Sequence, residues 1–504
     1  MNSKETDLRQ QDGEDTSYDH VLKYTGVFGG VQVLTMLVSM LRNKLAAWWL
    51  NKAGMGFFLM YSNIASFVSS ASNAGIPFSA VKNVSELYET ADSAQLESYV
   101  VTVRSWSLWT ALFGALLCVL MAPPISYFAF DGDWSYTLEV ALLAPMIFAI
   151  AITNGEISIL KGTRKLKRVA IISAASALLT LVSVLPFFYL WGVHGVIPAL
   201  VINALVVMVV HLRFSLPVFP WHVSLFSRRV LQQGMDMIKL GIPYVAASII
   251  NAFTALAIPA FLLGIGNIDD VGLYKVGYSI MVVYAGIVFV AVETDYFPRL
   301  SAVNNNVGRM NYAINQQIDI CVLLMAPLLV FMMMAMPWIV RLLYTAEFLP
   351  VVSMAVYSAF YMFFRAIMLP IAYTSLAKGD TLTYLVMEVV YDAFSFALIA
   401  AGFYWGGITG TGIALSVAGL LDVLMIATCY SLRYGFRFFS STVKLVAVQG
   451  CLLLAAMAFC ILGNAWLKYV GCMVVMLLSA FYSFRLLQKK TTVIDALKRK
   501  FINR

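Results

Sequence analysis

Apolar stretches of about twenty residues recur along this chain from residue 21 to residue 486. A helix of that length crosses the hydrocarbon core of a bilayer, so each stretch is a candidate membrane span. Only 12% of the 504 residues are charged, whereas a soluble domain carries roughly 25%. The sequence therefore predicts a polytopic membrane protein and excludes a soluble globule.

Fourteen stretches are predicted to be membrane-spanning helices, and the positive charges indicate how they are oriented. Cytoplasmic loops of membrane proteins retain Lys and Arg during insertion. With the N-terminus inside, 27 of the 34 Lys and Arg residues fall on inner segments, six fall on outer segments, and Arg365 lies within a span. Both termini are therefore predicted to be cytoplasmic. The spans are residues 22–47, 57–79, 104–130, 136–160, 169–190, 193–213, 237–263, 272–293, 315–343, 351–376, 382–404, 408–431, 442–463 and 466–486.

The sequence also repeats itself at a spacing of about 216 residues. NKAGMGF from Asn51 corresponds to NIDDVGL from Asn267, and GVHGVIPAL from Gly192 corresponds to GITGTGIAL from Gly407. Each half contains six spans, an even number, so the two halves have the same orientation in the membrane. The predicted fold is an all-α integral membrane protein with two six-helix lobes and two further helices. Its parts are a cytoplasmic tail (1–20), an N-lobe (21–213), a cytoplasmic linker (214–236), a C-lobe (237–432), helices 13 and 14 (441–486) and a basic cytoplasmic tail (487–504).

Several segments of the second half resemble a known family. They are KLGIPYVAASIINAF from Lys239, NIDDVGLYKVGYSI from Asn267, DYFPRL from Asp295, LYTAEFLP from Leu343 and the Lys-Gly turn at residue 378. Their order is similar to that in polysaccharide-biosynthesis flippases of the multidrug, oligosaccharidyl-lipid and polysaccharide exporter superfamily.

The resemblance implies a flippase in the bacterial inner membrane. Such a protein moves an isoprenoid-diphosphate-linked oligosaccharide from the inner to the outer leaflet, for O-antigen, capsule or a similar glycan. It also implies two lobes around a central cavity that cationic residues line, and alternating access to that cavity. The implied partners are the lipid-linked substrate, membrane lipids and other polysaccharide-assembly proteins; nucleic acid is not among them.

Cations within the spans are the candidate substrate-binding residues, because a buried charge is costly in a membrane. Arg365 lies near the middle of the tenth span, where its guanidinium either binds the substrate or pairs with Asp392. Arg42 and Lys44 lie toward the outer end of the first span, where they either line the cavity or extend to the headgroups.

Carboxylates form the second candidate group. Glu388 and Asp392 are four residues apart and so share one helix face, where they either carry a coupling proton or sodium ion or neutralise Arg365 and Lys378. Asp422 is predicted to be either a proton carrier or a hydrogen-bonded core acid. Three further acids, near inner helix ends, either line the cytoplasmic entrance or pair with loop cations. They are Glu156, Glu293 and Asp295.

No cofactor, metal site or catalytic residue is predicted. The six cysteines lie in apolar stretches without a CxxC pair, and no His has metal-ligand spacing. Two other functions remain open from the sequence. A cation-coupled multidrug exporter of the same superfamily would use intramembrane acids, although the first span has a cation instead. A glycan polymerase or ligase usually has a large outer loop, which this sequence lacks.

Overall fold

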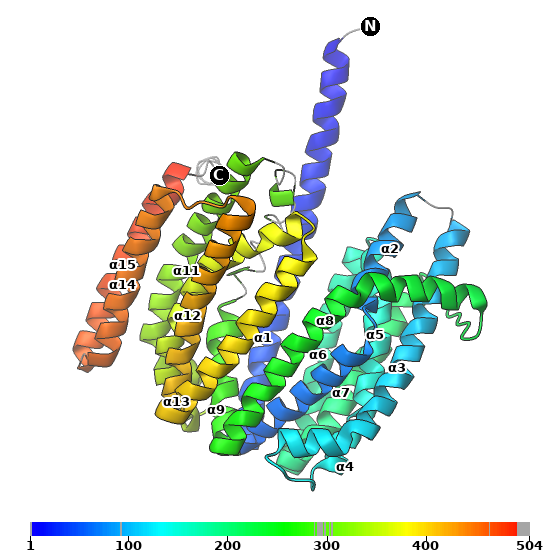
Figure 1. The fold of residues 1–504 in the computed structure, drawn as a ribbon, viewed down its shortest axis with the longest axis horizontal. Coiled ribbons are helices and arrows are strands. Elements are labelled where there is room, and N and C mark those ends of the chain that lie inside the picture. The colour runs from blue at the N-terminus through cyan, green and yellow to red at the C-terminus, as the bar shows by residue number, and fades with distance from the viewer. Residues whose placement is uncertain are drawn as a thin grey trace. The chain divides into compact units, whose positions relative to one another are not determined.

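The structure is a computed structural model, and it describes residues 3–90, 93–286, 288–289, 296, 299–301, 303, 306–462 and 464–490. Within these residues there are fourteen α-helices, two short 3₁₀ helices and one π-helical segment, and there is no strand. Figure 1 shows long helices along most of the chain. The prediction of an all-α membrane protein is confirmed.

The predicted spans lie on helices, although some helices contain two spans. α1 (Ser3–Ser72) changes direction at Asn51, where φ is 57° and ψ is −167°, and it contains the first span and most of the second, which ends in α2. α13 (Thr381–Tyr434) changes direction at Gly407 and contains spans 11 and 12. Span 4 is divided between α4 (Thr137–Ala141) and α5 (Ala144–Gly162), and span 8 includes α9 (Ile268–Tyr278) and the π-helical η2 (Ser279–Tyr284).

Helix lengths explain part of the difference between the fourteen predicted spans and the smaller number that hydropathy gives. Nine stretches of the described chain are long and apolar enough to cross a membrane, and two of them have 49 and 54 residues. A straight helix of 49 residues would be more than ~70 Å long, whereas the hydrocarbon core is about 30 Å thick. Each of these two stretches, Lys167–Ser215 and Thr381–Tyr434, therefore contains two spans.

The turns in these two stretches show the internal repeat in three dimensions. Gly192 has φ 54° and ψ −128°, and its equivalent Gly407 has φ 55° and ψ −144°. Only glycine adopts this backbone conformation without strain. Three residues further on, Gly195 and Gly410 each lie against the carbonyl of the residue eight positions earlier. The two lobes therefore turn in the same way at equivalent glycines, as the duplicated sequence predicts.

Contacts divide the chain into two compact units, Met1–Leu50 with Met60–Leu256, and Asn51–Leu59 with Ala257–Arg504. In the first unit, α3 (Ser93–Ala129) packs against α5, and α6 (Leu166–Trp191) packs against α7 (Val196–Ser215). α2 (Ile76–Thr90), α3, α5 and the start of α8 (Arg228–Ile265) share an apolar core that includes Val84, Val103, Ile159 and Met237.

The second unit has α11 (Val307–Leu343) at its centre, in contact with α12 (Val351–Ala377), α14 (Ser440–Leu462) and α15 (Ala465–Lys490). Methionines fill much of the buried surface of α11, including Met325, Met333 and Met336. Their flexible side chains suit the irregular spaces between helices. A 3₁₀ turn, η3 (Ala346–Phe348), joins α11 to α12.

Residues 51–59 of α1 belong to the second unit because they pack on α9. A side chain on Gly56 would meet the carbonyl of Ile268, and one on Gly272 would meet the carbonyl of Lys52. Gly56 and Gly272 are 216 positions apart in the sequence, and so are Lys52 and Ile268, so the contact is reciprocal between equivalent residues of the repeat. Lys52 also forms an ion pair with Asp269, with 3.3 Å between Nζ and Oδ2.

Large apolar side chains cover the outside of both units. Val182, Leu138 and Leu190 are about 70% exposed, and Trp405 is 82% exposed. Soluble monomers rarely expose apolar patches on this scale, whereas lipid tails solvate them without cost. The exposed surface therefore agrees with a multi-pass membrane protein.

Candidate functional site

The candidate site lies within the second unit, on α12 and the two halves of α13. Hydrogen bonds fix the register of these helices near their hairpin end. Ser353 Oγ and Thr409 Oγ1 are 2.6 Å apart, and Ser416 Oγ donates to the Tyr357 carbonyl at 2.6 Å. Gly412 permits close packing, because a side chain there would meet the Met354 backbone. The first residues of α12 therefore lie beside the turn of α13.

This register places three predicted site residues at similar distances from the hairpin end of α12 and α13. Arg365 is twelve residues beyond Ser353, and at a rise of about 1.5 Å per residue it lies roughly 18 Å along α12. Asp392 and Asp422 are each fifteen residues from Gly407, on opposite sides of the turn, and so lie about 22 Å from it. The fold therefore places one guanidinium and two carboxyl groups in the same layer of the unit.

Tyrosine hydroxyls surround the guanidinium of Arg365. Arg365 Nη1 donates to Tyr361 Oη at 3.2 Å, and Tyr391 Oη donates to the same oxygen at 3.1 Å. Tyr278 on α9 is also an electrostatic neighbour of the guanidinium. Arg365 Nε is buried and has no hydrogen-bond partner among the described residues. Tyr361 is thus the hydrogen-bond partner of Arg365, and whether Arg365 also pairs with Asp392 stays a prediction.

The three predicted carboxylates lie around this cluster. Asp392 is 5% exposed and Asp422 is 3% exposed. Glu388 is half-buried one helical turn from Asp392 and accepts a hydrogen bond from Tyr384. Asp422 has both Glu388 and Arg365 as electrostatic neighbours, and its Oδ1 is without a hydrogen-bond partner in the part of the chain that the structure describes. Such unpaired buried polar atoms are rare in folded proteins.

The chemistry of this cluster favours cations over anions. Glu388 and Asp422 are electrostatic neighbours of Arg365, and Asp392 lies in the same layer, so the cluster has more acidic than basic groups. Burial of a carboxylate is costly unless the group is paired or protonated. Among the described residues, no group of three or more His, Cys, Asp or Glu side chains is arranged to hold a metal ion.

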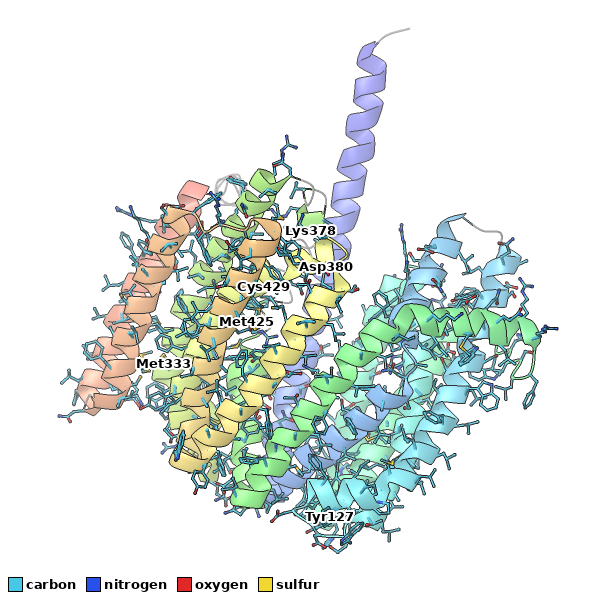
Figure 2. All side chains as sticks on the ribbon, in the orientation of Figure 1. Tyr127, Met333, Lys378, Asp380, Met425 and Cys429 are labelled. Atoms are coloured by element: carbon cyan, nitrogen blue, oxygen red, sulfur yellow. The ribbon has the colours of Figure 1, made fainter. Side chains whose placement is uncertain are left out.

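A second cluster of polar side chains lies at the opposite end of these helices, where α12 joins α13 (Figure 2). Asp380 accepts from the Thr383 backbone N–H at 3.1 Å, from Arg433 Nε at 2.9 Å and from Tyr434 Oη at 2.8 Å. The Thr383 N–H contributes most to lowering the pKa of Asp380 well below its usual value, followed by the Tyr434 hydroxyl. Asp380 caps α13 and ties its two ends together.

The predicted cations of the first span, Arg42 and Lys44, lie on α1 within the first unit. Both are half-buried, and Arg42 hydrogen-bonds Asn43 Oδ1 through Nε and Nη2 at 3.4 and 3.2 Å. Whether they bind substrate stays a prediction. Glu293 and Asp295 lie outside the described residues.

Glu156 is fully buried in the first unit and pairs with Arg104. Arg104 Nε lies 2.7 Å from Glu156 Oε1, and Nη2 lies 3.0 Å from Oε2. Arg104 Nη1 also donates to the Pro220 carbonyl at 2.6 Å, and Ser215 donates to Glu156. This geometry agrees with the pairing interpretation of Glu156. Arg104 was not singled out in the sequence, because its partner is 52 residues away and no local pattern joins the two.

Comparison with known proteins identifies the family. The model of a family described as polysaccharide biosynthesis protein matches residues 47–353, which is more than half of the chain. The chain belongs to this family. The resemblance to polysaccharide-biosynthesis flippases is therefore confirmed. No curated protein sequence matches the chain.

Solved structures place this polysaccharide biosynthesis protein in a transporter fold. The lipid II flippase MurJ, in an inward closed conformation, is 15% identical with a TM-score of 0.68, covering 91% of this chain and 99% of MurJ. An inward-facing multidrug resistance MATE family transporter of the MOP superfamily is 14% identical with a TM-score of 0.66, covering 81% of this chain and 96% of the transporter. A MOP superfamily transporter from Pyrococcus furiosus is 16% identical with a TM-score of 0.55, covering 81% and 96% of the two chains. Because the sequence identities are so low, these matches show a similar fold and nothing more.

Proposed function

We propose that this protein is a flippase that moves an isoprenoid-diphosphate-linked oligosaccharide from the inner to the outer leaflet of the bacterial cytoplasmic membrane by alternating access. The family match carries the proposal, because moving a lipid-linked glycan across the membrane is a step of polysaccharide biosynthesis that a protein with a transporter fold is suited to perform. The product would serve O-antigen, capsule or a related surface polysaccharide. Both termini would be cytoplasmic.

The cluster around Arg365 would couple transport to a cation, most simply a proton. Glu388, Asp392 and Asp422 supply acidic groups in a buried layer, and Arg365 balances part of their charge. Protonation of the three carboxyl groups would leave the charge of Arg365 uncompensated and make the layer attractive to the diphosphate. Release of the protons would make the layer negative again and favour substrate release. Arg42 and Lys44 would add positive charge along the substrate path.

A deletion strain complemented with Arg365→Ala tests this function. We expect surface glycan to fall strongly while lipid-linked oligosaccharide accumulates on the cytoplasmic side, because the cation that balances the carboxylates is lost. Arg341→Ala is the matched control, since Arg341 is exposed at the end of α11 outside the cluster. Normal glycan in the Arg365→Ala strain, with protein levels unchanged, would remove this residue from the mechanism.

A cation-coupled multidrug exporter is the second candidate, and the excess of carboxyl groups near Arg365 favours it. The likeness to a MATE transporter in fold is nearly as high as that to MurJ. The two functions predict different phenotypes for the deletion strain. Increased drug susceptibility with normal surface glycan would support the exporter, and loss of glycan with unchanged susceptibility would support the flippase.

A glycan polymerase or ligase is disfavoured by the fold, which is that of transporters. The deletion strain also distinguishes this third function. A polymerase or ligase defect would leave unpolymerised or unligated glycan outside the cell, whereas a flippase defect retains lipid-linked units inside.

A further inference from the structure

An apolar groove of about 350 Å³ lies within the first unit, between the end of α1, the first half of α3 and the start of α8. It is well separated in sequence from the Arg365 cluster, and the proposed function does not use it. Trp106, Trp109 and Phe113 on α3 form one side, and Leu231 on α8 and Ala71 and Ala74 at the end of α1 complete it.

The lining provides no polar group for a ligand. The hydroxyls of Ser72 and Thr110 donate to carbonyls of their own helices, Val68 at 2.9 Å and Ser107 at 3.1 Å. The indole N–H of Trp106 donates to the Val230 carbonyl at 3.0 Å. With these donors satisfied, the groove offers aromatic and aliphatic surface only. The groove therefore suits a hydrocarbon chain better than a polar ligand.

Specific contacts hold the groove in shape. The Trp109 indole N–H donates to the Leu225 carbonyl at 3.3 Å, and the exposed Phe226 ring packs edge-on against Trp109 with 6.1 Å between centroids. A side chain on Gly234 would collide with the Trp106 ring, so glycine allows α8 to approach α3 here. The segment before α8 is thus fixed on α3 and forms part of the rim.

Positive charge lies next to the groove. Arg228 and Arg229 are exposed in the first turn of α8, and Arg228 is three residues before Leu231, which places it on the same helix face. The N-terminus of a long helix adds partial positive charge at this position. Tryptophans are typical of the depth at which lipid headgroups meet the hydrocarbon core. An apolar groove with one arginine on the same helix face and a second, exposed arginine next to it in the sequence is complementary to an anionic lipid.

We propose that the groove holds an acyl chain of an anionic phospholipid whose headgroup binds Arg228 and Arg229. A membrane phospholipid is the occupant, rather than the transported substrate, because it is present in excess at every lipid-facing surface and an open groove exchanges it readily. The bound lipid would stabilise the packing of α8 on α3. The protein would therefore depend on the anionic lipid of the leaflet at that side.

Photocrosslinking of the full-length protein in vesicles tests the proposal. Phe113→p-benzoylphenylalanine places the probe on an exposed groove residue, and Phe128→p-benzoylphenylalanine on the same helix is the matched control, since Phe128 is also exposed and does not line the groove. The vesicles contain phosphatidylglycerol and phosphatidylcholine, with one of the two radiolabelled in each preparation. We expect the Phe113 probe to label phosphatidylglycerol with about a thirtyfold preference, the size expected for two arginines at one anionic headgroup at about 1 kcal/mol each. The Phe128 probe should show no preference.

Arginine removal and competition complete the test. Arg228→Ala with Arg229→Ala should abolish the preference at Phe113 and leave labelling at Phe128 unchanged. Absence of lipid labelling by the Phe113 probe would overturn the proposal. Equal labelling of both lipids by this probe, in the protein that retains Arg228 and Arg229, would also overturn it. Loss of phosphatidylglycerol labelling at Phe113 when a small amount of polyprenyl diphosphate is added before crosslinking would also overturn it, because the groove would then bind the transported substrate.

Discussion

Removal of one partner from the Arg104–Glu156 pair should destabilise the first unit strongly. The Arg104 side chain is 1% exposed and the Glu156 side chain is 2% exposed, so neither charge can be solvated when its partner is lost. Arg104→Met leaves a buried carboxylate and also releases the Pro220 carbonyl. Breaking a buried pair in this way typically costs about 3 to 5 kcal/mol. We expect a loss of that size in the free energy of unfolding.

The double variant separates the cost of an unpaired charge from the value of the pair. Arg104→Met with Glu156→Met removes both charges and fills the site with apolar groups, so it should recover most of the loss. Lys82→Met is the control, because the Lys82–Glu86 pair is 4.0 Å long and more than half exposed. Exposed pairs contribute at most about 1 kcal/mol.

Denaturant unfolding in mixed micelles, followed by circular dichroism, measures these differences. The reasoning is refuted if Arg104→Met costs no more than Lys82→Met. It is also refuted if the double variant loses as much free energy of unfolding as Arg104→Met and Glu156→Met lose together, because the two charges would then act independently.

Three further predictions follow from the second unit. Gly410→Val should destabilise the α13 hairpin by about 1 to 3 kcal/mol in thermal unfolding, because its side chain would meet the carbonyl of Gly402, whereas Gly406→Val, with open space around it, should cost less. Because the pKa of Asp380 is lowered in the folded state, its contribution to stability is present above the unfolded pKa of about 3.9 and is lost as the pH falls through the folded value. Asp380→Asn should remove that part of the acid dependence in a pH series of thermal unfolding, and an unchanged acid profile would refute this assignment. Arg365→Lys should restore less transport than wild type in a glycan-display assay, because an ammonium group lacks the forked donors that reach Tyr361; full restoration would show that charge alone suffices.

The sequence predicts the fold well because membrane spans follow from a simple solvent argument. Apolar length predicts helices, and the repeat at Gly192 and Gly407 predicts that two hairpins turn alike, as their φ values of 54° and 55° show. The boundary between the two compact units could not be predicted in the same way. Residues 51–59 join the second unit through close contacts at Gly56, and hydropathy carries no information about such contacts.

The candidate site was predicted in part. Intramembrane charges are costly, so Arg365, Asp392 and Asp422 stand out in the sequence, and the hairpin of α13 places the two acids at equal distances from Gly407. The immediate partners of Arg365 are tyrosines, which are too common in membrane proteins to be informative by themselves. Arg104 lies at the predicted start of a span, where a cation needs no explanation, so only the structure reveals its partner.

Transport by the purified protein tests the central claim most directly. The protein is reconstituted in vesicles with a fluorescent isoprenoid-diphosphate-linked oligosaccharide, and a membrane-impermeant reagent reports the fraction of substrate in the outer leaflet. The account predicts that the protein moves the substrate between leaflets, that a proton gradient changes the rate, and that Arg365→Ala abolishes it. An active drug transporter that leaves the lipid-linked oligosaccharide in its original leaflet would contradict the account.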